Sequence, residues 1–144
     1  HGGDIDKYVG DEIVAMFTET DGVLRASRAA LEIQQELSGT DSRLKVGIGL
    51  HMGEVVLGRI GSEKRADFTV IGDNVNTASR LCSAAGAGEV IISNESWLEI
   101  KEEAQIDGPY KVKAKGKQDF IKVFKLTGLN SDQQEPEQQT PEQN

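Results

Sequence analysis

Two short apolar runs near the start of the chain, residues 5–9 and 13–17, lie on either side of Gly10-Asp11. Gly and Asp favour tight turns, and strand-like runs around such a pair predict a β-hairpin. Side chains alternate along a strand, so Lys7 and Asp6 are expected on opposite faces of this hairpin. By position alone, the Asp11 carboxylate is a solvated turn residue.

Beyond the hairpin, helical and strand-like patterns are mixed. Apolar residues recur at helical spacing over 21–37 and 74–85, and a shorter helix is expected over 95–102. Strand-like patterns fall at residues 44–50, 54–60, 68–71, 90–92, 110–113 and 120–126. Gly47 and Gly49 share one face of their strand, where another backbone or a ligand could come close, and Asp73 is expected to cap a helix. This mixture predicts an α+β fold with a largely antiparallel sheet.

The distribution of charge separates a folded body from a tail. The 144 residues carry a net charge of −8, and four of those charges lie after residue 126, where there is no Lys or Arg. We therefore expect one domain over residues 1–126 and a disordered, acidic, Gln/Pro-rich tail over 127–144. The body has no basic face that would indicate a nucleic-acid partner. No apolar run is long enough to span a membrane.

Cysteine usage and the first residue bear on the cellular context. A single cysteine, Cys82, excludes an internal disulfide and a multi-cysteine zinc site. The chain starts at His1 and shows no signal-peptide pattern. We expect a piece of a longer protein with an upstream regulatory domain. The expected location of this piece is cytoplasmic, whether or not the parent protein is attached to a membrane.

Several polar residues could carry chemistry. Asn76 and Arg80 are four residues apart, so they share one face of the expected helix, and the Arg fork suits phosphate oxygens. Taken alone, such a pair is more often a solvated helix face than a site. Thr69 precedes that helix and could be an ordinary strand residue. Lys115 lies in a Lys-Gly-Lys triplet that could be only a solvated loop.

Three segments together resemble a known family. IDKYVGDEIVAMF, VGIGLHMGEVVLGRIGSEKRADFTVIGDNVNTASRL and AKGKQDFIKVFKL are similar to the catalytic domain of class III nucleotidyl cyclases. The resemblance runs from Gly2 to about Leu126, and its central block is too long and specific for a generic strand-helix joint. It implies a ferredoxin-like α+β core, similar to polymerase palm domains. It also implies a homodimer that holds the nucleotide between protomers.

The resemblance implies a role for each candidate residue. Asp11 matches one of two metal-binding aspartates, and Lys7 and Thr69 match the pair that reads adenine. Guanylyl cyclases typically carry Glu and Cys at these two positions, so the pair implies ATP. Asn76 matches the residue that orients the ribose, and Arg80 the residue that stabilises charge on the reacting phosphate. Lys115 matches the lysine that meets the terminal phosphates, with Lys117 a less secure candidate.

The implied reaction is an adenylate cyclase reaction. The ribose 3′-hydroxyl of ATP attacks the α-phosphorus, giving 3′,5′-cyclic AMP and pyrophosphate. Two Mg²⁺ or Mn²⁺ ions per site assist in the intact domain. The alternative is a non-catalytic cyclase-like module that binds nucleotide or a partner and regulates. A diguanylate cyclase is disfavoured because the Gly2-Gly3-Asp4 triplet is not followed by an acidic residue and an aromatic one.

One departure from the family pattern bears on activity. The family's first metal aspartate lies on a strand well upstream of the hairpin, and this chain starts after it. We therefore expect the 144-residue chain by itself to be inactive as a cyclase, while its parent is active.

Overall fold

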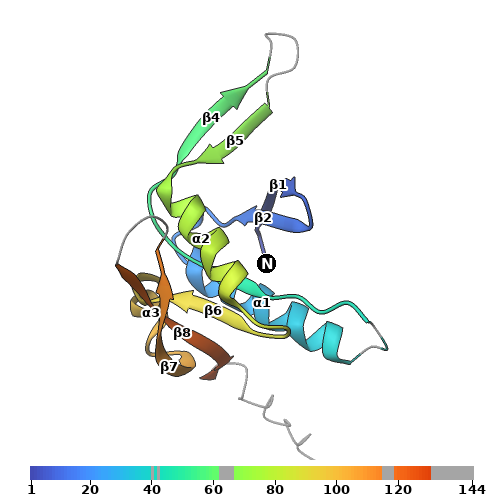
Figure 1. The fold of residues 1–144 in the computed structure, drawn as a ribbon, viewed down its shortest axis with the longest axis vertical. Helices are drawn as coiled ribbons and strands as arrows, with labels where there is room; N and C mark the ends of the chain where they lie inside the picture. The colour runs from blue at the N-terminus through green and yellow to red at the C-terminus, as the bar shows by residue number, and fades with distance from the viewer. Residues whose placement is uncertain (40, 42, 62–66, 115–118, 131–144) are drawn as a thin grey trace, which may run out of the picture.

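A computed structural model describes residues 1–39, 41, 43–61, 67–114 and 119–130 of the chain. Its main sheet has four strands in the order β3-β6-β8-β7, of which β6, β8 and β7 are labelled in Figure 1. These strands are β3 (Ile48–Leu50), β6 (Val90–Ser93), β8 (Phe120–Leu129) and β7 (Ala104–Lys113). Only β3 and β6 pair in parallel, and the other two pairs in this sheet are antiparallel. The predicted α+β fold with a mostly antiparallel sheet is confirmed.

Helices cover both faces of this sheet because the side chains of its strands alternate in direction. Helices α1 (Gly22–Ser38) and α3 (Asn94–Ile100) pack on the face of β6 that carries Val90 and Ile92. Helix α2 (Asp73–Ala84) packs on the opposite face, where Leu81 contacts the cluster around Ile91. All four residues of β6 are buried, which makes this strand the centre of the core.

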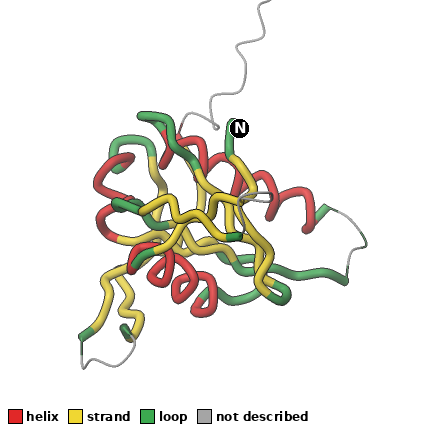
Figure 2. Tube along the Cα trace, turned by 90° about the horizontal axis from the view of Figure 1, so that it is seen from above, coloured by secondary structure: helices red, strands yellow, loops and turns green. Residues whose placement is uncertain are grey.

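Two hairpins extend the fold beyond the main sheet. The first consists of β1 (Asp4–Val9) and β2 (Glu12–Met16), and Gly10 in its turn has a φ of +61° that favours glycine. The second consists of β4 (Val56–Ile60) and β5 (Asp67–Ile71), and it projects away from the body of the molecule (Figures 1 and 2). The first hairpin was predicted, whereas for the second only its two strands were predicted and not their pairing; both hairpins lie beside α2 in Figure 1.

Strand β1 contains an irregularity that changes the direction of its side chains. Ile5 pairs with Ala15 and Lys7 pairs with Val14, so Asp6 is an extra residue between two successive pairs. Such a bulge interrupts the strict alternation of side chains. The expectation that Asp6 and Lys7 lie on opposite faces is therefore wrong: both side chains reach β5.

A close approach between a strand and a helix confirms the role expected for the glycine face. A Cβ on Gly49 would lie 2.3 Å from the backbone nitrogen of Cys82 and 2.7 Å from the backbone oxygen of Ala78. Both atoms belong to α2, so β3 and α2 pack backbone to backbone at this point. Only glycine leaves room for that contact.

Several expected boundaries differ from the structure. Strand β3 covers only the last three residues of 44–50, and β4 begins at Val56 rather than at residue 54. Strand β7 begins at Ala104, six residues before the expected start. Gly72 rather than Asp73 is the N-cap of α2, and Asp73 lies in its first turn.

The C-terminal boundary also differs. Strand β8 continues to Leu129, whose buried side chain joins the core, so the body extends past the expected end at residue 126. Residues 131–144 of the expected tail lie outside the described residues. Among the helices in the described ranges, none is long and apolar enough to cross a membrane.

Candidate active site

The side chain of Lys7 reaches from one hairpin to the other. Its Nζ donates to Thr69 Oγ1 at 3.0 Å and to the Val70 carbonyl at 2.8 Å. Thr69 is buried, and the Lys7 side chain is 31% exposed. The structure therefore brings together the two residues that the sequence assigned to base recognition, although 62 positions separate them.

Asp6 completes this contact and was not identified from the sequence. Its carboxylate accepts from Thr69 Oγ1 at 3.0 Å and from the Val70 backbone N–H at 3.2 Å. The same carboxylate lies 3.4 Å from Lys7 Nζ, and the side chain is only 2% exposed. The one signal in the sequence is an acidic residue next to Lys7. Regular alternation along a strand would place its side chain on the face opposite Lys7, and only the bulge brings the two together.

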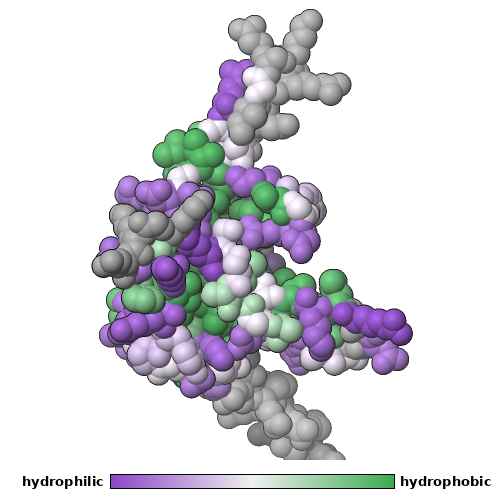
Figure 3. Space-filling view, viewed as in Figure 1, coloured by the Kyte–Doolittle hydropathy of each residue, from purple (hydrophilic) through white to green (hydrophobic). Residues whose placement is uncertain are grey.

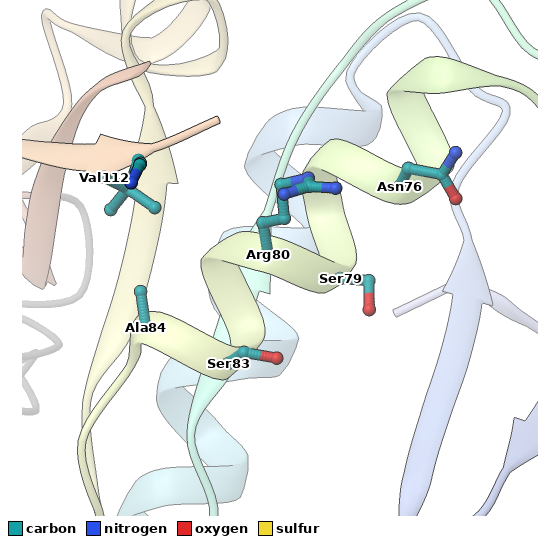
Figure 4. Close-up of a pocket in the computed structure, with 7 residues that line it drawn as sticks. Asn76, Ser79, Arg80, Ser83, Ala84 and Val112 are labelled. Carbon is teal, nitrogen blue, oxygen red and sulfur yellow. The ribbon is translucent and has the colours of Figure 1, made fainter. Parts of the chain in front are cut away.

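Helix α2 presents the second group of predicted residues. Asn76 and Arg80 line a pocket of about 610 Å³ together with Ser79, Ser83, Ala84, Val112 and Lys113. Figure 4 shows Asn76 and Arg80 along α2, with Val112 of β7 across the pocket. Lys113 was not identified from the sequence, and it adds a second cation to the lining. An Arg and a Lys beside an amide are suited to an anionic, hydrogen-bonding ligand such as a phosphate group.

Asp11 lies in the turn between β1 and β2, and its side chain is exposed. The next residue, Glu12, accepts hydrogen bonds from Ser79 Oγ at 3.0 and 3.1 Å through its two carboxylate oxygens. This contact joins the hairpin that carries Asp11 to the helix that carries Asn76 and Arg80. Neither Glu12 nor Ser79 was singled out from the sequence, and their types alone give no such signal.

Asp11 offers one carboxylate to a cation. In the part of the chain that the structure describes, no group of three or more His, Cys, Asp or Glu side chains could hold a metal ion. A single exposed carboxylate still fits Mg²⁺, which usually keeps several waters and relies on substrate phosphates for further ligands. Lys115 and Lys117, the candidates for the terminal phosphates, lie outside the described residues.

Cys82 lies on α2, and its surroundings favour the protonated thiol. Burial raises the pKa of its thiol, and the negative charges of Glu12 and Asp11 raise it further. The thiol is therefore neutral near pH 7 and a poor nucleophile. Its Sγ donates to the Gly47 carbonyl at 3.4 Å, between α2 and the segment that leads into β3. Cys82 therefore packs between α2 and this segment.

Comparison with known proteins identifies the family. Residues 12–128 match the adenylate and guanylate cyclase catalytic domain, and the chain belongs to this family. An adenylate cyclase of Anabaena cylindrica is 38% identical over 146 aligned positions, which cover 87% of this chain. The chain spans only 28% of the length of that relative.

Solved structures agree with this assignment. The guanylyl cyclase Cya2 matches with a TM-score of 0.73 and 33% identity, covering 89% of this chain and 71% of that one. The adenylyl cyclase CyaB from P. aeruginosa matches with a TM-score of 0.69 and 30% identity, covering 88% and 72%. Because one structure is a guanylyl cyclase and the other an adenylyl cyclase, similarity to them does not determine which nucleotide base this chain recognises.

Proposed function

We propose that this chain is the catalytic part of an adenylate cyclase in cyclic-nucleotide signalling. In this proposal, ATP is converted to 3′,5′-cyclic AMP and pyrophosphate. The observation that carries the proposal is the contact between Lys7 and Thr69, with Lys7 Nζ 3.0 Å from Thr69 Oγ1. These are the residue types that the family resemblance associates with adenine.

The chemistry of the two side chains supports the choice of ATP. Lys7 can only donate hydrogen bonds, and adenine offers a ring-nitrogen acceptor on its pairing edge. A guanine in the same place would present an N–H donor to the same ammonium group. The adenylate cyclase of Anabaena cylindrica, at 38% identity, is consistent with this choice.

Two residues of α2, together with Lys115, would act on the ribose and the phosphates. Asn76 would orient the ribose through its amide. The 3′-oxygen would lose its proton to solvent and bond to the α-phosphorus while the bond to the leaving pyrophosphate breaks. Arg80 would stabilise the charge that builds on the phosphate oxygens, and Lys115 would hold the terminal phosphates. Removing a charge of this kind typically costs about 10²–10³ in rate.

Asp11 would hold a divalent cation together with the substrate phosphates. When bound there, Mg²⁺ or Mn²⁺ supplies charge neutralisation and a lower pKa for the ribose hydroxyl. The contribution of Asp11 is a fixed carboxylate at the hairpin turn, next to Glu12, whose bonds to Ser79 at 3.0 and 3.1 Å hold the turn against α2.

The proposal includes a homodimer with sites shared between protomers. Its support is the apolar surface of the two hairpins, which no part of the described chain covers. Figure 3 shows hydrophobic surface at the base of the β4–β5 hairpin. The exposed apolar side chains on the two hairpins are Ile5, Tyr8, Val9, Ile13, Val56, Leu57 and Ile71. Apolar surface of this kind marks protein–protein contacts in soluble proteins.

The test is an assay of the full-length protein that carries this chain, with ATP or GTP and with Mg²⁺ or Mn²⁺. We expect cyclic AMP and pyrophosphate in equal amounts, with GTP turned over much more slowly. The Arg80→Ala variant is expected to form cyclic AMP about 10²–10³-fold more slowly while still binding ATP. ATP binding without turnover by the unaltered protein would favour the regulatory alternative instead.

A further inference from the structure

We propose that Asp6 is a positioning residue that sets the preference for adenine over guanine, by fixing the direction of the hydrogen bonds made by Thr69. The inference rests on the proposed nucleotide site, and it adds a residue that acts through Lys7 and Thr69 rather than on the substrate. It starts from a carboxylate that is only 2% exposed and has no role in the proposed reaction.

The bulge in β1 explains how this carboxylate reaches the base-recognition pair. Because Asp6 is the extra residue between the pairs made by Ile5 and Lys7, it faces β5 together with Lys7. Its oxygens accept from Thr69 Oγ1 at 3.0 Å and from the Val70 N–H at 3.2 Å. The Thr69 hydroxyl, the Val70 N–H and the Lys7 ammonium group, which come from two hairpins, therefore all lie around one buried carboxylate.

The types of the partners determine the direction of each hydrogen bond. An ionised carboxylate can only accept, and a lysine ammonium group can only donate. Thr69 has one hydroxyl proton, so that proton points to Asp6, and the Thr69 oxygen accepts from Lys7 at 3.0 Å. Towards a ligand, the Thr69 oxygen therefore offers only a lone pair. Lys7, with two N–H groups directed at Thr69 and Val70, retains donor capacity for a ligand.

This arrangement matches adenine and opposes guanine. The pairing edge of adenine has a ring-nitrogen acceptor, which suits Lys7, beside an amino donor, which suits the Thr69 lone pair. The edge of guanine has the reverse order, a ring N–H beside a carbonyl oxygen. The guanine carbonyl would face a lone pair, since the Thr69 proton is committed to Asp6. A buried mismatch of donors and acceptors is a strong basis for rejecting a substrate.

A purely structural role is the competing explanation, because Asp6 also satisfies the Val70 N–H. The two roles differ in what they predict. A structural role would weaken ATP and GTP use together when Asp6 is changed. A positioning role changes their ratio, because only the guanine carbonyl gains from a Thr69 hydroxyl that is free to turn.

The Asp6→Asn variant separates the two roles because it keeps the size of the side chain. Its amide oxygen can still accept from the Val70 N–H, while its NH₂ group then faces Thr69 and donates. The Thr69 proton is released toward the ligand, and Lys7 loses its anionic neighbour. We expect the ratio of kcat/KM for ATP to that for GTP to fall at least about tenfold, chiefly through KM.

Two further variants complete the experiment on the full-length protein. Asp4→Asn makes the same change of charge on an exposed position of the same strand, and it should leave the ratio unchanged. In a Thr69→Val background, Asp6→Asn should no longer alter the ratio, because the hydroxyl through which it acts is absent. A ratio unchanged by Asp6→Asn, or altered equally in both backgrounds, would overturn the inference.

Equilibrium binding keeps this result distinct from the test of the proposed function. Displacement of a fluorescent ATP analogue by ATP and by GTP, with Mg²⁺, measures base preference without turnover. If the protein binds ATP preferentially and makes no cyclic AMP, the proposed function fails, and the effect of Asp6→Asn on binding still decides the role of Asp6. If the protein makes cyclic AMP and Asp6→Asn keeps its full preference, only the inference about Asp6 fails.

Discussion

At the scale of residues, Lys7 and Thr69 can be exchanged together to test base choice. The Lys7→Glu, Thr69→Cys double variant should lose ATP turnover and gain GTP turnover, because a carboxylate accepts from the guanine N–H groups. We expect the ATP-to-GTP ratio of kcat/KM in the full-length protein to shift by about 10² or more. Equal use of ATP and GTP by the unaltered protein would contradict the assignment.

The neighbouring Asp6 adds a condition to this prediction. Asp6 lies 3.4 Å from Lys7 Nζ, so the Lys7→Glu carboxylate would face a second carboxylate in a buried place. Like charges at such a distance repel strongly when water is excluded. The switch should therefore be more complete when Asp6→Asn is added, and kinetics of the triple variant with GTP measure this gain.

The sequence identified Lys7, Thr69, Asn76 and Arg80 through family resemblance, and the structure shows the first two in contact and the last two in one pocket. The sequence did not identify Asp6, because a one-residue bulge depends on how two strands pair and is not visible in the sequence pattern of either strand. Glu12 and Ser79 were missed because a contact across 67 positions depends on the tertiary fold.

At the scale of elements, the packing of β3 on α2 depends on Gly49. A methyl group there would lie 2.3 Å from the Cys82 nitrogen and 2.8 Å from the Leu81 carbonyl carbon. These are backbone atoms that cannot turn aside, so Gly49→Ala must push α2 away from the sheet. We expect a loss of about 1–3 kcal/mol in the free energy of unfolding, measured by urea denaturation.

Gly39→Ala is the matched control. Gly39 has a φ of −84°, and a Cβ there would meet its nearest atom at 3.5 Å, which is ordinary contact. Its effect should remain within about 1 kcal/mol. Similar losses in the two variants would show that the close approach of β3 to α2 is not what constrains Gly49.

The contact between Glu12 and Ser79 should hold the β1–β2 hairpin against α2. Ser79→Ala leaves the Glu12 carboxylate without the hydroxyl that it accepts from at 3.0 and 3.1 Å. We expect a loss of about 1–2 kcal/mol in the free energy of unfolding. Ser38→Ala, which removes only a local bond to Gln35 at 2.9 Å, is the control and should change it by less than about 0.5 kcal/mol.

At the scale of the whole molecule, two variants that are each inactive can restore activity when mixed, if each site takes residues from both protomers. In the proposed dimer, Asp11 serves the site whose Asn76 and Arg80 come from the partner. A mixture of full-length Asp11→Ala and Arg80→Ala proteins should then recover activity, because one of the two sites in each mixed dimer is intact. Cyclic AMP formation is the measurement. No recovery when mixed dimers are demonstrated would contradict sharing.

The 144-residue chain assayed alone provides a second test at this scale. It covers 71% of the solved Cya2 chain and carries one of the two metal aspartates that the family resemblance implies. Loss of one carboxylate leaves a cation with fewer fixed ligands. We expect negligible cyclic AMP formation with Mg²⁺ or Mn²⁺, and clear activity from the full-length protein. Robust turnover by the chain alone would contradict a two-metal mechanism.

The bond from the Val70 N–H to Asp6 gives the molecule a built-in reporter of hairpin docking. This amide points out of the β4–β5 ladder, and its acceptor lies 64 positions away on β1. It is therefore protected from exchange with deuterated solvent only while the two hairpins are docked. Its exchange rate measures how often the base-recognition pair comes apart in an otherwise folded chain. A nucleotide that engages both hairpins must slow that exchange, and one held by its phosphates alone must leave it unchanged.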